Sequence, residues 1–168
     1  MKPNNPGNLT LRPFLDSDIT LMEKWLAVPH VAKWYLHPDH WLHELHNRRG
    51  EYSFITHFIV EYENVPIGFC QYYDCYFSQA HEVWNDTWNI AEHKGEIFSL
   101  DYLIGEVDYL HCGFGKKILF QLLEKLRETG AATIIVQPDK ENTASCRLLE
   151  SCGFQYYGDE YVFELKGK

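Results

Sequence analysis

The sequence contains no long hydrophobic run and no paired cysteine spacing. None of its apolar runs approaches the ~18 to 20 residues that a membrane-spanning helix needs, and residues 1–8 lack the apolar segment of a secretory signal. Its five cysteines are odd in number and form no C-x-x-C motif, which favours reduced thiols over a disulfide framework. We therefore expect a cytoplasmic protein that has no membrane partner.

Positive charge is also scarce. The chain has 15 Lys and Arg residues against 24 Asp and Glu residues, which gives a formal net charge of −9. Nucleic-acid binding needs a basic surface, so this balance argues against a nucleic-acid partner. An acidic surface concentrates cations and suits a cationic small-molecule substrate, although the same charge also serves solubility alone.

The chain has the length of an ordinary domain and the composition of a globular protein. The chain has 168 residues, of which 45 % are hydrophobic and 15 % aromatic, and this sets it apart from disordered sequences. No internal repeat or linker divides it. We expect residues 1–8 to be a flexible lead-in and residues 9–168 to form a single domain.

Hydrophobic periodicity predicts a mixed α/β fold. A strand–helix–strand crossover over residues 96–136 predicts that its two strands are parallel neighbours. The polar segment 78–94 is expected to be a long loop or a broken helix, and loops of that length are often functional. The patterns predict strands at residues 9–13, 54–62, 66–76, 96–104, 132–136, 154–157 and 161–165, and helices after an N-cap at Asp16 or Ser17 and at residues 31–35, 38–49, 113–129 and 142–152.

A turn that contains two glycines joins a predicted strand to the longest predicted helix. The run is Leu110-His111-Cys112-Gly113-Phe114-Gly115-Lys116-Lys117. Glycines let the backbone approach a ligand closely, and the N–H groups at the start of a helix bind phosphate. The run lacks the spacing of a Walker A loop and has only the G-x-G part of a dinucleotide fingerprint, so a purely structural turn is equally compatible with it.

A second motif follows on the next helix. Asn142, Ala144, Gly153 and Phe154 have the spacing of an asparagine motif that ends in Gly-Phe. With both motifs in this order, the chain resembles the GNAT acetyltransferases, in which a Q/R-x-x-G-x-G turn cradles the pyrophosphate of coenzyme A. The resemblance implies acetyl-CoA as the cofactor. It also implies the GNAT fold, a central and mostly antiparallel sheet with a parallel pair of strands at the CoA site, flanked by helices.

The resemblance narrows to the aminoglycoside 6′-N-acetyltransferases. It rests on residues 30–35 (HVAKWY), on residues 66–71 (PIGFCQ) and on Asp101, and a similar pattern occurs in siderophore-type lysine N-acyltransferases. Two positions depart from the family pattern. Leu110 stands where many members have Gln or Arg, and Leu149 replaces the tyrosine that often protonates the CoA thiolate. The general acid is therefore unassigned.

The resemblance assigns the catalytic role to Asp101, which is expected on the central strand near the attacking amine. A carboxylate there can take the proton that the amine must lose, and a buried structural carboxylate is the alternative reading. Glu106 is the second candidate for the same role. For the cofactor, we expect contacts from the backbone of Leu103 and Gly105, from the Asn142 side chain, and from the backbone of His111, Cys112, Gly113, Phe114, Gly115 and Lys116.

Aromatic and acidic residues are expected to form the acceptor site. Most of the aromatic residues belong to the core by default, but some of them can wall an acidic pocket for a polycation, to which Glu82 would also add charge. The candidate acceptor-binding residues are Trp34, Tyr35, Gln71, Tyr73, Asp74, Trp84, Asp86 and Asp101.

Two other chemistries are weaker. His37, His40, His43 and His46 recur at every third residue, a period that drifts around a helix, so we expect a solvated face and no metal site. The neighbours His111 and Cys112 are unsuited to a Cys–His nucleophile, whose two members must face each other. We therefore expect direct transfer in a ternary complex.

The predicted function is acetylation of a primary amine on a small cationic molecule, with an aminoglycoside as the first choice. One alternative is acylation of a lysine derivative, a siderophore precursor or a protein amine. Another is a non-catalytic CoA-binding module of the same fold. The sequence is compatible with either a monomer or a homodimer.

Overall fold

The computed structural model describes residues 7–165. Residues 1–6, which make up most of the predicted lead-in, and residues 166–168 lie outside the described residues. The described residues form two compact units. The first contains the residues up to Gln71 together with Tyr102–Ile118, and the second contains Tyr72–Asp101 together with the residues from Leu119 onward. A single domain over residues 9–168 stays a prediction.

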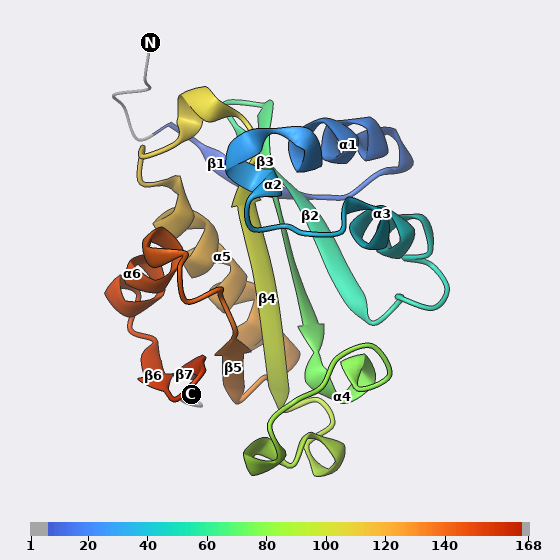
Figure 1. Ribbon diagram of the computed structural model, residues 1–168, viewed down its shortest axis with the longest axis vertical. Helices are drawn as coiled ribbons and strands as arrows, with labels where there is room; N and C mark the ends of the chain where they lie inside the picture. Colours follow the sequence, from blue (N-terminus) through green and yellow to red (C-terminus); the bar gives the residue numbers. More distant parts are fainter. Residues whose placement is uncertain (1–6, 166–168) are drawn as a thin grey trace. The chain divides into compact units, whose positions relative to one another are not determined.

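The helices and strands follow one another in the predicted order (Figure 1). The strands are β1 (Leu9–Pro13), β2 (Ile55–Tyr62), β3 (Val65–Asp74), β4 (Ile97–Ile104), β5 (Thr133–Val136), β6 (Gln155–Tyr157) and β7 (Glu160–Glu164). The α-helices are α1 (Ile19–Ala27), α2 (Pro29–Ala32), α3 (Pro38–His46), α4 (Cys75–Ser78), α5 (Phe114–Thr129) and α6 (Thr143–Ser151).

The seven strands form one sheet in the order β1-β2-β3-β4-β5-β7-β6. β4 and β5 are parallel, with Ile97 opposite Thr133 and Phe98 opposite Ile134. The pairs β1–β2, β5–β7 and β6–β7 are antiparallel. The predicted mixed sheet, mostly antiparallel and with one parallel pair at the crossover, is therefore confirmed.

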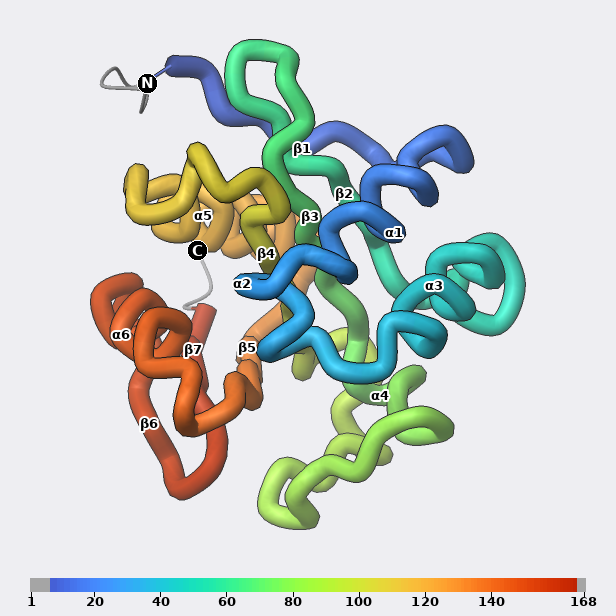
Figure 2. The backbone as a smooth tube through the Cα atoms, turned by 45° about the horizontal axis from the view of Figure 1, so that its top comes forward, coloured from blue at the N-terminus to red at the C-terminus, as the bar shows by residue number. Residues whose placement is uncertain are grey.

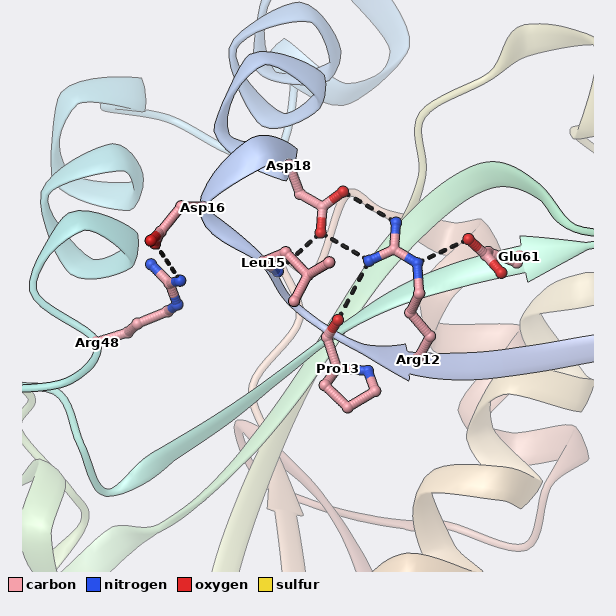
Figure 3. Close-up of polar contacts among 7 residues, drawn as sticks. All are labelled: Arg12, Pro13, Leu15, Asp16, Asp18, Arg48 and Glu61. Carbon is pink, nitrogen blue, oxygen red and sulfur yellow. Dashed lines mark hydrogen bonds and ion pairs between the residues drawn. The ribbon is translucent and has the colours of Figure 1, made fainter.

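The start of α1 differs from the prediction. Asp16–Asp18 form a 3-10 turn, η1, and α1 begins at Ile19 without a side-chain cap. The Asp18 carboxylate instead accepts the Leu15 N–H at 2.8 Å and binds the Arg12 guanidinium, while Asp16 pairs with Arg48 (Figure 3). The N-cap predicted at Asp16 or Ser17 is wrong because tertiary ion pairs determine the local geometry here.

The core of the first unit forms around α1. Met22, Trp25 and Leu26 lie on one face of this helix and are buried, which is the amphipathic spacing that the sequence predicted. They pack with Phe69 of β3 and Leu103 of β4 in one hydrophobic cluster. The strand end that carries Leu103 is thereby fixed against α1.

The other helices of the first unit are shorter than predicted. α2 is a single turn that starts at Pro29, and α3 ends at His46 rather than near Arg49. Figure 2 traces the short connections that join α1, α2 and α3. The predicted β2–β3 hairpin turns at Glu63 and Asn64, both of which have positive φ, as a tight two-residue hairpin turn requires.

The second unit contains the helix with the asparagine motif. Asn142 is the N-cap of α6, since its Oδ1 accepts the Ser145 N–H at 3.2 Å. The helix ends as predicted at Gly153, whose φ is +94°. The Gly153 N–H bonds to Glu150 O and the Phe154 N–H bonds to Leu149 O, which together form a Schellman motif.

The sequence predicted a long loop or a broken helix at residues 78–94, and the structure has a broken helix between β3 and β4. It consists of α4 and two 3-10 turns, η2 (Asp86–Trp88) and η3 (Ile90–Glu92). Ile90 packs with Cys75, Ile97 and Ile135 in the core of the second unit, so a hydrophobic anchor holds the polar segment. Within residues 7–165, no helix is long and apolar enough to cross a membrane, and no group of three metal-ligating side chains is found.

Candidate active site

The glycine turn before α5 has a left-handed backbone at two positions. A 3-10 turn, η4 (Val107–Tyr109), leads into it, and both His111 (φ +59°) and Gly113 (φ +79°) have positive φ. α5 then begins at Phe114, and the first N–H groups of a helix have no acceptor within the helix. A Cβ at Gly113 would meet no atom within 4 Å, so the space beside the turn is open to a ligand.

Aromatic packing holds this turn in place. Phe114 is buried and its ring lies 4.9 Å from that of Tyr62 and 6.0 Å from that of Tyr109, measured between centroids. The Lys117 ammonium lies over the Phe114 ring at 5.7 Å. Because side-chain packing fixes both ends of the turn, its backbone N–H groups are held in position for a ligand.

The chemistry of these groups fits a diphosphate. Backbone N–H groups at a helix start, together with the exposed Lys116, present positive charge to an anion. Leu110 adds no polar group, so binding here would depend on the backbone and the lysines. The Cys112 thiol lies 3.4 Å from Leu110 O, a contact within the turn itself.

The C-terminal end of β4 differs from the expectation for Leu103 and Gly105. The Gly105 N–H donates to Ile67 O of β3 at 2.8 Å. Leu103 O approaches Gly68 of β3 so closely that a Cβ there would lie 2.3 Å from it. These backbone groups therefore face β3 and are used within the sheet.

The alternate residues of β4 face the other edge. Because backbone groups alternate along a strand, the C=O groups of Tyr102 and Ile104 point away from β3. Each accepts a side-chain hydrogen bond, from Tyr35 Oη to Tyr102 O at 2.5 Å and from His30 Nε2 to Ile104 O at 2.9 Å. On this geometry, backbone contacts to the cofactor would come from Tyr102 and Ile104 rather than from Leu103 and Gly105.

Glu106 is poorly suited to the role of base. Its Oε1 accepts from Lys24 Nζ at 2.5 Å and from Trp25 Nε1 at 2.9 Å. Burial acts against ionisation, but these hydrogen bonds and the charges of Lys24 and His30 outweigh it and lower the pKa of Glu106. A carboxylate that is held by a cation takes up protons weakly, so the arrangement favours a structural role for Glu106.

Three predicted acceptor residues lie in the first unit. Gln71 is buried on β3. Trp34 is half-buried, and the Lys33 ammonium lies over its ring at 4.6 Å. The Tyr35 ring packs on Trp41 at 5.0 Å. The hydrogen bond from Tyr35 to β4 gives this residue a role that the sequence did not suggest.

In the second unit, Asp101 belongs to a polar group around Tyr73. Tyr73 is buried, and its hydroxyl donates to both carboxylate oxygens of Glu82 at 3.1 Å. Burial and then the negative charges of Asp101 and Glu82 raise the pKa of Tyr73 well above its usual value, against a hydrogen bond with Ser99. Asp101 and Glu82 are 19 positions apart in the sequence, and their charges both raise the pKa of the Tyr73 hydroxyl.

The same unit contains a buried carboxylate that the sequence analysis missed. Glu160, at the start of β7, is only 4 % exposed. One of its oxygens accepts from Gln137 Nε2 at 2.8 Å, and the other accepts from Trp88 Nε1. Both donors are neutral. The sequence contains a signal for this residue, because Glu160 directly precedes the apolar run Tyr161-Val162-Phe163. A charged residue beside a buried strand is costly unless it has a partner or a function.

Acidic groups also surround Cys75. Burial raises the pKa of the Cys75 thiol, and the charges of Glu82, Asp74 and Glu160 raise it further. Glu82 acts on both Tyr73 and Cys75, and it thereby connects Asp101 of β4 with Glu160 of β7 within the second unit. We name the group Asp101, Glu82 and Glu160 the acidic cluster.

The remaining predicted residues of the second unit have structural partners. The two carboxylate oxygens of Asp74 accept the N–H groups of Tyr76 (3.0 Å) and Gly95 (2.8 Å). Trp84 donates to Ser78 Oγ at 2.8 Å and packs on the core, while Asp86 is exposed at the start of η2. The Oδ1 of Asn142 accepts the N-cap hydrogen bond from the Ser145 N–H, and its Nδ2 amide is a donor suited to the predicted contact with pantetheine.

The second unit also contains a pocket of about 620 Å³. It is bordered by Trp88, Arg127, Gly153 and residues of β6 and β7. Neither the predicted acceptor residues nor the acidic cluster line it. Since it lacks these groups, we assign it no part in the chemistry.

Known proteins are similar to this chain over most of its length. The family model described as "Acetyltransferase (GNAT) domain" matches residues 15–160. The aminoglycoside N(6′)-acetyltransferase type 1 of Klebsiella pneumoniae is 24 % identical over 163 residues, which cover 92 % of this chain and 78 % of that protein. This relative therefore shares most of its length with the chain.

Solved structures show the same fold. The crystal structure of aminoglycoside acetyltransferase AAC(6′)-Ib in complex with coenzyme A and kanamycin matches with a TM-score of 0.75 at 22 % identity, over 94 % of this chain and 95 % of that one. The aminoglycoside N(6′)-acetyltransferase of Legionella pneumophila matches with a TM-score of 0.71 at 16 % identity, over 96 % and 94 %.

Proposed function

Since this chain belongs to the acetyltransferase (GNAT) domain family, we propose that it transfers the acetyl group of acetyl-CoA to a primary amine of a polycationic small molecule, with an aminoglycoside as the first choice. GNAT acetyltransferases use acetyl-CoA, which supplies an acetyl thioester that an amine can attack. The acceptor is the part of the proposal that goes beyond the family. It is supported by the relatives named above, which are aminoglycoside acetyltransferases.

The observation that carries the choice of acceptor is the acidic cluster. Asp101, Glu82 and Glu160 come from separate segments of the second unit, and the oxygens of the buried Glu160 are bonded only to neutral donors in the contacts described above. Buried charges are normally paired. Ammonium groups of an acceptor would supply the opposite charge, and a net charge of −9 would draw a polycation toward the protein.

Asp101 is proposed as the group that takes the proton of the attacking amine. It is half-buried on β4, whereas the competing carboxylate of Glu106 is held by Lys24. The backbone of the turn before α5 and Lys116 would bind the diphosphate of the cofactor. Leu149 is fully buried and carries no acidic proton, so water is the proposed proton source for the leaving thiolate.

The test is an assay of CoA release from acetyl-CoA with a panel of aminoglycosides, lysine derivatives, polyamines and peptides. We expect turnover with aminoglycosides, and we expect none with a matched aminoglycoside that carries a hydroxyl in place of the 6′-amine. The acceptor KM should rise with ionic strength, because salt screens a polycation from the acidic cluster. Turnover only with a lysine derivative or a peptide would overturn the acceptor class and leave the family assignment intact.

A further inference from the structure

We infer that His30 and Tyr35 are positioning residues that fix the C-terminal end of β4 for acyl-CoA. This inference deepens the proposed function and rests on its use of acetyl-CoA as the donor. The inference gives neither side chain a role in binding the acceptor.

The two side chains bind neighbouring positions on one edge of β4. Tyr35 Oη donates to Tyr102 O at 2.5 Å, and His30 Nε2 lies 2.9 Å from Ile104 O. A carbonyl oxygen can only accept, so Nε2 of His30 carries the proton. Carbonyls two residues apart on a strand lie ~6.6 Å apart. His30 lies in α2, a single turn of helix, and Tyr35 follows three residues after this helix ends. Figures 1 and 2 show α2 passing beside this end of β4.

The donors themselves are held rigidly. Val31 lies between them on α2 and is only 2 % exposed, which anchors the turn in the core of the first unit. The Tyr35 N–H donates to Val31 O at 2.9 Å, and the Tyr35 ring packs on Trp41. Fixed donors give fixed carbonyl positions.

The backbone on the other side of this strand end is equally constrained. Gly105 packs against Trp25 so tightly that a Cβ there would lie 2.1 Å from its ring. The Gly105 N–H bonds to Ile67 O of β3. With His30 and Tyr35 on one edge and β3 on the other, the segment Tyr102–Glu106 has little freedom to shift.

The consequence for acyl-CoA follows from the direction of the backbone groups. The Ile104 N–H points to the same edge as its C=O, and the amide and thioester oxygens of acetyl-CoA are hydrogen-bond acceptors. His30 and Tyr35 occupy the acceptors of this edge. The edge therefore presents the Ile104 N–H as a hydrogen-bond donor, which is complementary to the acceptor oxygens of acetyl-CoA. The position of this donor is set before acetyl-CoA binds.

The experiment measures acetyl-CoA binding by calorimetric titration, which needs no acceptor. The variants are Tyr35→Phe, which removes only the hydroxyl, His30→Leu, and His30→Gln, which keeps a donor. Tyr157→Phe is the matched control, because Tyr157 is exposed and its hydroxyl donates to Gln155, a residue of the second unit. Thermal unfolding is recorded for each variant so that a loss of fold is recognised.

We expect the Kd for acetyl-CoA to rise about threefold to tenfold in Tyr35→Phe and in His30→Leu, as loss of one neutral hydrogen bond implies. His30→Gln should recover part of the loss, and Tyr157→Phe should match the wild type. In turnover, the KM for acetyl-CoA should rise more than the KM for the acceptor.

An unchanged Kd in folded Tyr35→Phe and His30→Leu would overturn the inference while the proposed function stands. A rise in the acceptor KM alone would also overturn it, because it would place Tyr35 in the acceptor site. Failure of the wild-type protein to bind acetyl-CoA would instead contradict the proposed function itself.

Discussion

Arg12 binds the carboxylate of Asp18 through both terminal nitrogens, with Nη1–Oδ2 at 2.7 Å and Nη2–Oδ1 at 2.9 Å (Figure 3). The third guanidinium nitrogen of Arg12, Nε, donates to Glu61 on β2 at 2.7 Å. Asp18 also accepts the Leu15 N–H. One arginine thus ties β1 to both β2 and the turn that starts α1, the helix whose Trp25 packs against the end of β4.

Asp18→Asn should destabilise the protein by about 2 kcal/mol. Loss of one partner from a fully buried pair costs ~3 to 5 kcal/mol, but the Arg12 side chain is 28 % exposed whereas that of Asp18 is 6 % exposed, so water lowers the cost. Urea unfolding measures the change. Asp16→Asn is the matched control on the same turn, and it should have a much smaller effect because Asp16 is solvent-exposed. Equal losses in both variants would refute the assignment.

The contribution of Asp18 should disappear at low pH. Burial disfavours its charge, but the hydrogen bonds from Arg12 and Leu15 outweigh burial and lower the pKa of Asp18. A lowered folded-state pKa gives stability that is present above the unfolded value of about 3.9 and is lost as the pH falls through the folded value. The stability gap between wild type and Asp18→Asn should be constant near neutral pH and should close below about pH 4. Urea midpoints at stepped pH measure it, and a gap that does not narrow at all as the pH is lowered below about 4 would contradict the pairing.

Asp101→Asn should lower kcat about 100-fold to 10,000-fold, the range for loss of a general base. Glu106→Gln is the informative comparison, because its carboxylate is already held by Lys24 and Trp25. It should lower stability while the acidic limb of the pH–rate profile stays unchanged. Steady-state kinetics across pH separate the two residues. Loss of the acidic limb in Glu106→Gln would transfer the role of base to Glu106.

Glu160→Gln should raise the acceptor KM about tenfold and leave the KM for acetyl-CoA unchanged. The substitution keeps the size of the side chain and removes a buried charge that we propose for the acceptor ammonium; loss of a charged hydrogen bond costs ~1.5 to 3 kcal/mol. Asp159→Asn is the control, since Asp159 is the exposed neighbour that pairs with Lys140. If both variants shift the acceptor KM equally, the effect is one of general surface charge and Glu160 has no specific role.

Gly113→Ala should weaken acetyl-CoA binding. Alanine at φ +79° costs about 1 kcal/mol in backbone strain, and the turn relieves that strain by moving the N–H groups that we propose for the diphosphate. Gly158→Ala controls for the strain alone, because Gly158 has φ +68° and equally open surroundings in the β6–β7 hairpin. Both variants should lose similar stability in urea, but only Gly113→Ala should raise the Kd measured by titration. Similar Kd values in the two variants would remove the turn from the cofactor site.

The elements of the fold could be predicted well from local pattern. α5 and α6 follow the 3.6-residue period of their apolar residues, and the Schellman motif at Gly153 depends on the backbone freedom of one residue. Such signals lie within a few positions of each other, so the sequence contains them in full. Two of the mispredicted boundaries, at the start of α1 and the end of α3, involve Asp16 and its partners Arg48 and Arg49, which are more than 30 positions away in the sequence.

By itself, the sequence determined the family, the order of the elements and the glycine turn before α5, because motifs of fixed spacing and periodic burial are local properties of the chain. Only the tertiary structure decided which side chains meet. It turned Leu103 and Gly105 toward β3, held Glu106 with Lys24, placed His30 and Tyr35 on the β4 edge, and gathered Glu160 with Glu82 and Asp101. The physical reason is that hydrogen bonds and charges act through space over a few ångströms, and the residues that they join are separated by tens of positions along the chain.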